Sequence, residues 1–236
     1  MYQHMAKRTT KPVLFSESVQ PEIKVTVNLE DMVEYGFTAG ELTCIEGTHS
    51  VLTDLVHYLG VRTYLMFHQD TVYIDGGYDA NPYRIARYAR LMEVNEYEVL
   101  KHVFISRAFT VHQLSMLIQE SLEQVVQQQE PLTVIVGGFP FLYSDGDVPI
   151  TEAKQLLIND LTALKTLAQQ HQLIVVVTND ESKRVHPLCQ HEIRNHVDAR
   201  VFLPDALVKP MTRAKHKRSS YVTDGQMQLE QFYKVM

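Results

Sequence analysis

The sequence predicts an α/β fold with a mainly parallel β-sheet flanked by helices and antiparallel strands at its C-terminal end. Two observations support this prediction. Short apolar runs rich in Val and Ile alternate with longer segments of helical periodicity over much of the chain. The apolar runs also lack the alternation of apolar and polar residues that marks half-exposed strands, which is typical of strands buried on both faces. Such alternation of strands and helices predicts parallel strands joined by right-handed crossovers.

Five apolar runs are the candidates for parallel strands. They lie at residues 42–45, 71–74, 102–105, 133–136 and 173–178. Segments with helical periodicity lie between them, at residues 52–65, 82–92, 110–128 and 151–170. Pro82 stands at the first position of its predicted helix, where the missing N–H costs little. The segment at 151–170 has an amphipathic apolar stripe, which indicates a helix packed on the sheet.

The pattern changes after residue 179. A polar, histidine-rich segment predicts a loop to about residue 195. Antiparallel strands are then predicted at residues 199–203, 220–222 and 227–232, with Asp224-Gly225 as a hairpin turn. Residues 1–24 lack periodicity and are predicted to form an N-terminal arm, so that residues 25–236 form a single core domain.

Composition and charge limit the class of protein. The net charge is −6, yet the segment from residue 181 to residue 218 has nine Lys or Arg against four Asp or Glu. This asymmetry indicates either a face that meets a polyanion or a solvated basic loop. No apolar run suits a membrane span or a secretory signal. Two cysteines, Cys44 and Cys189, make no disulfide framework, which predicts an intracellular protein of the cytoplasm, the nucleoid or a eukaryotic nucleus.

Four motifs follow one another between residues 71 and 113: a strand that ends in Tyr-Ile-Asp, a Pro-x-Arg helix start, an Arg-Ala-Phe strand end and a following His-Gln. These motifs, in this order, resemble those of the RadA/RecA-like recombinase family. The stretches FTAGELTCIEG and LTALKTLAQQHQLIVVVTND are similar to the approach to the family's phosphate loop and to its sensor strand. The resemblance spans about residues 25–235 and implies a RecA-like core domain without the family's N-terminal helical domain.

The phosphate loop departs from the family's pattern. That pattern is G-x-x-x-x-G-K-[ST], in which the lysine neutralises phosphate and the hydroxyl residue holds magnesium. The resemblance places Gly47 at the first glycine and Thr53 at the hydroxyl position, with a loop one residue short. Val51 then replaces the second glycine, and Leu52 stands in the place of the lysine. We therefore expect no ordinary phosphate binding here.

The hydrolytic groups of the family are also replaced. Gly77 stands where the resemblance places the glutamate that activates water, and Gly137 stands where it places the magnesium-ordering aspartate. The glutamine that senses the γ-phosphate aligns with Asp180, whose charge would repel a phosphate. The sequence therefore predicts a pseudo-ATPase that is not an enzyme and holds no cofactor.

Arg84 leaves two readings open. The resemblance places it where the family's arginine stacks on adenine, so Gly47, Thr53 and Arg84 could form a vestigial nucleotide site with residual ATP binding. Alternatively, Arg84 pairs with a surface carboxylate. A similar choice applies to Asp75, which could be a leftover polar group at the end of its strand.

DNA contact in the family comes from two loops. The first corresponds here to FLYSDGDVPITEAK, which has Asp145 and Asp147 and no arginine, so we expect it to be unsuited to DNA. The second lies in the basic segment, and its cations could give salt-sensitive binding indifferent to sequence. The predicted DNA-binding residues are Lys183, Arg184, Arg194, Lys209, Arg213, Lys215, Lys217 and Arg218. A solvated basic face or an acidic protein partner are the alternatives.

Two further features concern metal binding and the N-terminal arm. His186, Cys189, His191 and His196 include zinc-type ligands, but their spacing matches no known finger, and we predict no metal. Phe15, in the arm, could imitate the arm phenylalanine by which family members dock on a neighbouring core, or it could pin the arm to its own domain.

These inferences predict a catalytically inactive RadA-like paralogue that assists homologous recombination and DNA repair. It would bind DNA through the basic face at 181–218, dock on an active recombinase or another RecA-like paralogue, or do both, with no membrane contact. Two alternatives remain. One is a scaffold or regulatory subunit without a DNA role, since fold alone does not decide function. The other is a weak nucleotide binder with an atypical site.

Overall fold

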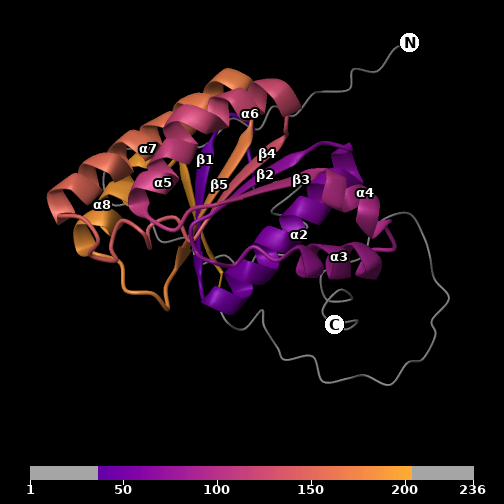
Figure 1. Ribbon diagram of the computed structural model, residues 1–236, viewed down its shortest axis with the longest axis horizontal. Helices are drawn as coiled ribbons and strands as arrows, with labels where there is room; N and C mark the ends of the chain where they lie inside the picture. The colour runs from indigo at the N-terminus through magenta and orange to yellow at the C-terminus, as the bar shows by residue number, and fades with distance from the viewer. Residues whose placement is uncertain (1–36, 204–236) are drawn as a thin grey trace, which may run out of the picture.

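The computed structural model describes residues 37–203, which build one six-stranded parallel sheet (Figure 1). The strand order is β3-β2-β4-β5-β1-β6, and each neighbouring pair is parallel. The strands are β1 (Leu42–Gly47), β2 (Thr71–Asp75), β3 (Val103–Arg107), β4 (Thr133–Gly137), β5 (Ile174–Asp180) and β6 (Ala199–Leu203). The predicted α/β class with a mainly parallel sheet is confirmed.

Helices cover both faces of the sheet. One face packs on α2 (His49–Phe67), α3 (Pro82–Leu91) and α4 (Glu96–Lys101). The other face packs on α5 (Val111–Met116), the π-helical turn η2 (Leu117–Ser121), α6 (Leu122–Gln129), α7 (Ile150–His171) and α8 (Pro187–His196). Each face has its own apolar cluster, so the domain is a three-layer α/β/α sandwich.

The last described strand differs from the prediction. β6 runs parallel to β1, with Thr43 opposite Ala199 and Gly47 opposite Leu203. The expectation of an antiparallel strand at 199–203 is therefore wrong, because α8 supplies a crossover that brings the chain back to the amino end of the sheet. The predicted strands at 220–222 and 227–232, with their turn, lie outside the described residues.

The segment predicted as a polar loop contains α8. His186 caps this helix by accepting a hydrogen bond from Leu188 N at Nδ1 (3.2 Å), and Pro187 occupies its first turn. Cys189 and Ile193 are buried against the core at helical spacing. A Pro at the first position and apolar residues four apart are helix signals that the polar composition concealed.

The parallel sheet brings the ends of its strands together. Gly47, Asp75, Arg107, Gly137 and Asp180 are the last residues of five strands and lie at one edge. In open α/β folds, ligands bind at this carboxyl edge. Among residues 37–203, no helix is long and apolar enough to cross a membrane.

Candidate functional site at the carboxyl edge of the sheet

The junction between β1 and α2 is closed. Only Thr48 separates Gly47, the last residue of β1, from His49, the first residue of α2. A Cβ atom on Gly47 would lie 3.0 Å from the carbonyl oxygen of Leu203, and the carbonyl of Gly47 accepts a hydrogen bond from Glu181 N at 2.9 Å. The chain therefore passes from strand to helix in a tight turn rather than in an open loop.

The side chains that follow this turn are buried. Leu52 is 4% exposed and packs in the same apolar cluster as Val51 and Leu203. Thr53 is 5% exposed, and its hydroxyl has no hydrogen-bond partner among the described residues. The position that the resemblance gives to the phosphate-binding lysine thus holds an apolar side chain inside the core.

Glycine backbones fill the space between the ends of β2 and β4. Gly76 N donates to the carbonyl of Gly137 at 2.9 Å. A Cβ on Gly77 would lie 2.8 Å from Asp79 Oδ2 and 3.2 Å from the Cα of Gly138, and a Cβ on Gly137 would lie 2.8 Å from the Tyr73 ring. Real Cβ atoms essentially never approach other heavy atoms below 3.0 Å. Gly77 therefore packs closely on the Gly138 backbone and Gly137 on the Tyr73 ring, and neither position has room for a carboxylate side chain.

Asp75 has a structural role. Its fully buried carboxylate accepts hydrogen bonds from the backbone N–H groups of Gly77, Asp79 and Ala80 at 3.2, 2.9 and 2.9 Å. Arg107 Nε donates to the same carboxylate at 2.8 Å, and the other end of its guanidinium donates to the carbonyl of Ala80. These bonds fix the loop after β2 and leave Asp75 no exposed acceptor for a ligand.

His49 links two carboxylates across the edge. Its Nδ1 lies 3.2 Å from Asp180 Oδ2 and its Nε2 lies 3.4 Å from Asp79 Oδ1. Burial raises the pKa of Asp79 above its ordinary value, while His49 and Lys183 oppose that rise. Sequence reasoning missed His49 and Asp79, because they come from the start of α2 and the loop after β2 and meet only in the folded chain.

Arg84 makes the surface pair that was one of its two predicted readings. Its Nη1 lies 2.8 Å from Asp54 Oδ1, and both side chains are partly exposed. Asn81 caps α3 by accepting a hydrogen bond from Tyr83 N, which places Arg84 in the first turn of that helix. Arg84 therefore lies beside α2, and its guanidinium is paired with the carboxylate of Asp54.

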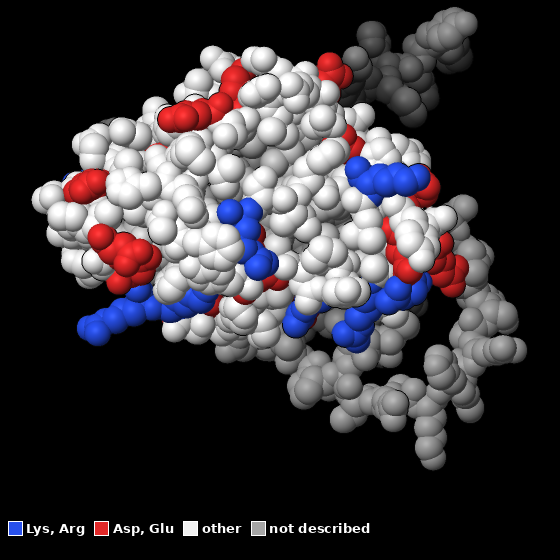
Figure 2. Space-filling view, viewed as in Figure 1, with Lys and Arg blue, Asp and Glu red and all other residues white. Residues whose placement is uncertain are grey.

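Three of the predicted DNA-binding residues lie in the described part of the chain: Lys183, Arg184 and Arg194. Lys183 is turned into the carboxyl edge, where its Nζ donates to the carbonyl of Gly77 at 3.1 Å and lies 4.4 Å from the centre of the Phe141 ring. Arg184 and Arg194 are exposed and form no hydrogen bond or ion pair with any part of the chain between residues 37 and 203. On the face shown in Figure 2, blue and red side chains are interspersed. The remaining predicted residues lie outside the described residues: Lys209, Arg213, Lys215, Lys217 and Arg218.

Cys189 of α8 and His186, which precedes this helix, have structural roles. Cys189 is buried and its thiol faces the carbonyl of Tyr143 at 3.7 Å, while His186 caps the helix. No group of three or more His, Cys, Asp or Glu within residues 37–203 could hold a metal ion.

The loop after β4 is anchored in the core. Phe139, Leu142 and Tyr143 are buried, and the Tyr143 hydroxyl donates to Asp160 Oδ2 at 2.6 Å. The other oxygen of Asp160 accepts hydrogen bonds at 2.8 Å from Ser115 Oγ and Gln119 Nε2. This buried network ties the loop to α7, α5 and η2, which leaves only the acidic tip around Asp145 exposed.

The Asp160 network predicts a specific pH dependence. Burial raises the pKa of Asp160, although its three hydrogen bonds oppose the rise. The folded state therefore takes up a proton at this carboxyl before the unfolded state does, so protonation favours folding as pH falls from neutrality toward the ordinary Asp pKa. We expect the difference in unfolding free energy, wild type minus Asp160→Asn, to become more positive as the pH is lowered from about 7 to about 4. Urea titrations at each pH measure this difference.

A matched control removes the contribution of other titrating groups. Asp145→Asn removes an exposed carboxyl of the same loop, so the pH profile of Asp160→Asn is compared with that of this variant at each pH. A wild-type advantage over Asp160→Asn that shrinks as pH falls would contradict the role given to Asp160.

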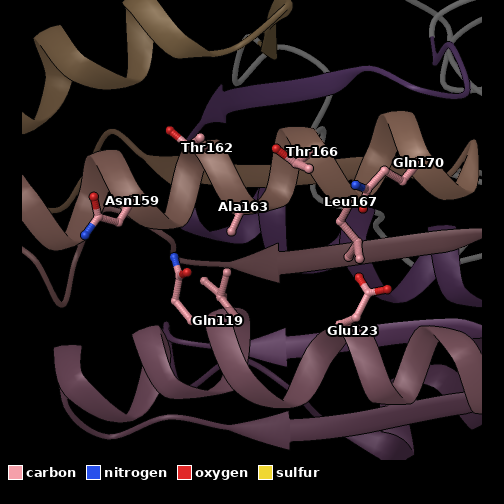
Figure 3. Close-up of a pocket in the computed structure, with 9 residues that line it drawn as sticks. Gln119, Glu123, Asn159, Thr162, Ala163, Thr166, Leu167 and Gln170 are labelled. Atoms are coloured by element: carbon pink, nitrogen blue, oxygen red, sulfur yellow. The ribbon is translucent and has the colours of Figure 1, made fainter.

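Two hollows lie on the α5–α7 side of the sheet. One, of about 270 Å³, adjoins the edge strand β3 and has a mostly apolar lining, which includes Phe104, Leu117 and Val125. The other, of about 480 Å³, is a more polar groove between α7 and the η2–α6 segment. Figure 3 shows Gln119 and Glu123 on one side of this groove and Asn159 and Gln170 on the other.

Comparison with known proteins gives two findings. The family model described as Rad51 matches residues 23–197, which is most of the chain. The DNA repair protein Rad51 homolog of Drosophila melanogaster is 28% identical over 159 residues, which cover 64% of this chain and 47% of that protein. The chain thus spans about half the length of this curated relative.

Proposed function

The chain belongs to the Rad51 family, as its resemblance to RadA/RecA-like recombinases indicated, and from this membership we propose that it is an accessory factor in homologous recombination and DNA repair. In this proposal it acts inside the cell, hydrolyses no ATP, and docks on an active recombinase or on another RecA-like paralogue.

The observation that carries the proposed inactivity is the filled carboxyl edge of the sheet. Leu52 is buried where the family's pattern has a lysine, and the β1–α2 junction has no open loop. Binding a triphosphate and magnesium there requires positive charge and exposed backbone N–H groups. The glycine packing around Gly77 and Gly137 also supports the absence of a water-activating carboxylate.

Docking is supported by the edge of the sheet at β3. Within residues 37–203, β3 pairs only with β2, so its outer edge has unpaired backbone groups. The apolar hollow beside this edge is lined by residues from β2, β3, η2 and α6. An exposed strand edge beside an apolar pocket suits an extended peptide that adds a strand and inserts one side chain. The resemblance implies a segment of this kind, the arm that bears the family's phenylalanine, and in this proposal Phe15 plays that part for a second copy of the chain.

A charge placed in the hollow should weaken this docking. Leu117→Lys puts an ammonium group among the apolar lining residues, and we expect at least a tenfold loss of affinity for the organism's active recombinase, about 1.4 kcal/mol. Met116→Lys, at the neighbouring exposed position outside the hollow, should bind as the wild type does. The affinities can be measured by surface plasmon resonance, with and without Mg-ATP.

The two variants decide the proposal together. Equal losses for Leu117→Lys and Met116→Lys would place the contact elsewhere, and no measurable binding by the wild type would remove the docking function altogether. Circular dichroism and thermal melts of both variants exclude unfolding as the cause.

DNA binding is the second candidate, favoured by the side chains of Arg184 and Arg194, which are exposed and have no ion-pair partner within residues 37–203. Neutralising phosphates with these groups and with the basic cluster that follows would give an affinity that falls steeply with salt. Reversing the charges of Lys215, Lys217 and Arg218 should then weaken single-stranded DNA binding at low salt. Unchanged affinity in that variant would leave docking as the function.

A further inference from the structure

His57 joins two helices from inside the core. The residue lies in α2 and is only 1% exposed. Its Nδ1 lies 2.5 Å from the carbonyl oxygen of Thr53, one turn earlier in the same helix, and its Nε2 accepts a hydrogen bond from the backbone N–H of Asn81 at 2.9 Å. Asn81 is the N-cap of α3, so the imidazole links α2 to the residue at which α3 begins.

The two backbone partners determine where the ring of His57 carries its proton. A carbonyl oxygen can only accept a hydrogen bond, so Nδ1 must be protonated, whereas a backbone N–H can only donate, so Nε2 must be unprotonated. The ring is therefore the neutral Nδ1–H tautomer. An imidazolium has a donor at both nitrogens and would lose its hydrogen bond with Asn81.

The charged groups around His57 come from α2, α3 and β2. They are Asp54, Arg84 and Asp75, respectively. The ring of Tyr73 also lies edge-on, with its centre 6.2 Å from that of the imidazole. Burial is the main cause that lowers the pKa of His57, and Arg84 adds to this effect, while the Thr53 carbonyl and the two carboxylates oppose it. The surroundings therefore favour the same neutral ring that the hydrogen bonds require.

The bond to His57 completes a series along the loop after β2. The N–H groups of residues 77, 79 and 80 donate to Asp75, and the N–H of Asn81 donates to His57. The side chain of Asn81 in turn accepts a hydrogen bond from Tyr83 N at 3.0 Å, which caps α3. Protonation of His57 would leave the Asn81 N–H without its acceptor at the point where α3 begins, although the partly exposed Arg84–Asp54 pair would remain.

We propose that His57 is an acid-sensitive link between the helices, which holds Asn81 and the start of α3 against α2 while the ring is neutral and releases this end of α3 when the ring is protonated. An imidazole freed from the core has a pKa of about 6.5. The closed state keeps the ring neutral, so the opened state binds more protons below this pH. Acidification therefore favours opening, by up to about tenfold per pH unit. This inference does not rest on recombinase docking, because the hollow beside β3 lies on the other face of the sheet.

Amide hydrogen exchange of the full chain tests the link. The protection of single amides is read by NMR and corrected for the intrinsic exchange rates at each pH. Between about pH 7.5 and about pH 5.5, we expect the protection of the Asn81 amide to fall about tenfold in the wild type. The amide of Arg84, which donates to the Asn81 carbonyl at 2.9 Å, should follow it. At the lower pH the amide of Val136, in the central strand β4, should remain better protected than both, because only the start of α3 opens.

Two substitutions of His57 separate its role as an acceptor from its titration. His57→Gln can place an amide oxygen near the position of Nε2 but does not titrate, so the Asn81 amide should lose little protection over this range. The side chain of His57→Asn is too short to reach Asn81, so that amide should be weakly protected at both pH values. As a matched control, His102→Gln changes a histidine that pairs with Asp70 instead, and it should keep the wild-type profile at Asn81.

Three results would overturn the inference. One is protection of Asn81 in the wild type that does not change between the two pH values, and another is a fall in His57→Gln as large as in the wild type. The third is an Asn81 amide as well protected as Val136 at the lower pH, since the start of α3 would then open only with the whole domain. If neither variant folds, side-chain ¹⁵N NMR of the wild type decides at the higher pH. The Nδ1–H tautomer is expected for His57, and an Nε2–H tautomer or an imidazolium would contradict the link.

Discussion

Gly77→Glu is expected to lower the unfolding free energy by at least about 3 kcal/mol and to produce no ATPase activity. The substitution restores the family's glutamate by sequence. However, the first side-chain atom would meet Asp79 Oδ2 at 2.8 Å and the Gly138 backbone at 3.2 Å. The new carboxylate would also lie beside two existing ones, Asp75 and Asp79. Urea denaturation measures the loss, and phosphate release measures the activity.

Gly146→Glu is the matched control for this variant. Gly146 also lies in a loop that follows a strand of the sheet, but a Cβ there would meet nothing within 4 Å. Its cost should be that of the positive φ alone, about 1–2 kcal/mol. A Gly77→Glu protein as stable as this control, and able to hydrolyse ATP, would refute the view that the site is filled.

Asp75→Ala is expected to cost about 3–5 kcal/mol of unfolding free energy, because it leaves the Arg107 guanidinium and three backbone N–H groups without their acceptor. Asp75→Asn keeps one acceptor oxygen and should lose less. Asp54→Ala removes the partner of Arg84 at the surface and should cost no more than about 1 kcal/mol. Chemical denaturation of the three variants gives the order directly, and a loss at Asp75 as small as that at Asp54 would contradict its structural role.

The central strands were predictable because they are continuous apolar runs, without alternation of apolar and polar residues. This pattern can be recognised without knowledge of tertiary contacts. The direction of β6 was not predictable in the same way. It depends on α8, whose Pro187 start and Cys189–Ile193 spacing were masked by the polar composition of the segment. Helix α4 was also missed. Asn95 caps it and Glu98 follows three residues later, a pattern that is itself a helix-start signal.

The candidate site was predictable only in part. Similarity of sequence located Gly47, Leu52 and Gly77 at the carboxyl edge, because the ends of parallel strands must meet there. It could not show that Asp75 is saturated by backbone donors, nor that His49 bridges Asp79 and Asp180. The residues of this bridge are up to 131 positions apart, and no local pattern marks them as partners. The same holds for the Tyr143–Asp160 contact, which joins a loop to a distant turn of α7.

The most direct test of this account is calorimetric titration of the wild-type chain with Mg-ATP, at concentrations that detect a dissociation constant near 1 mM, about −4 kcal/mol of binding free energy. The account predicts no heat of binding from folded protein, since the β1–α2 junction has no open loop and Leu52 offers no charge. Saturable heat that disappears in Arg84→Ala would contradict it, because the carboxyl edge would then still hold a nucleotide without its lysine.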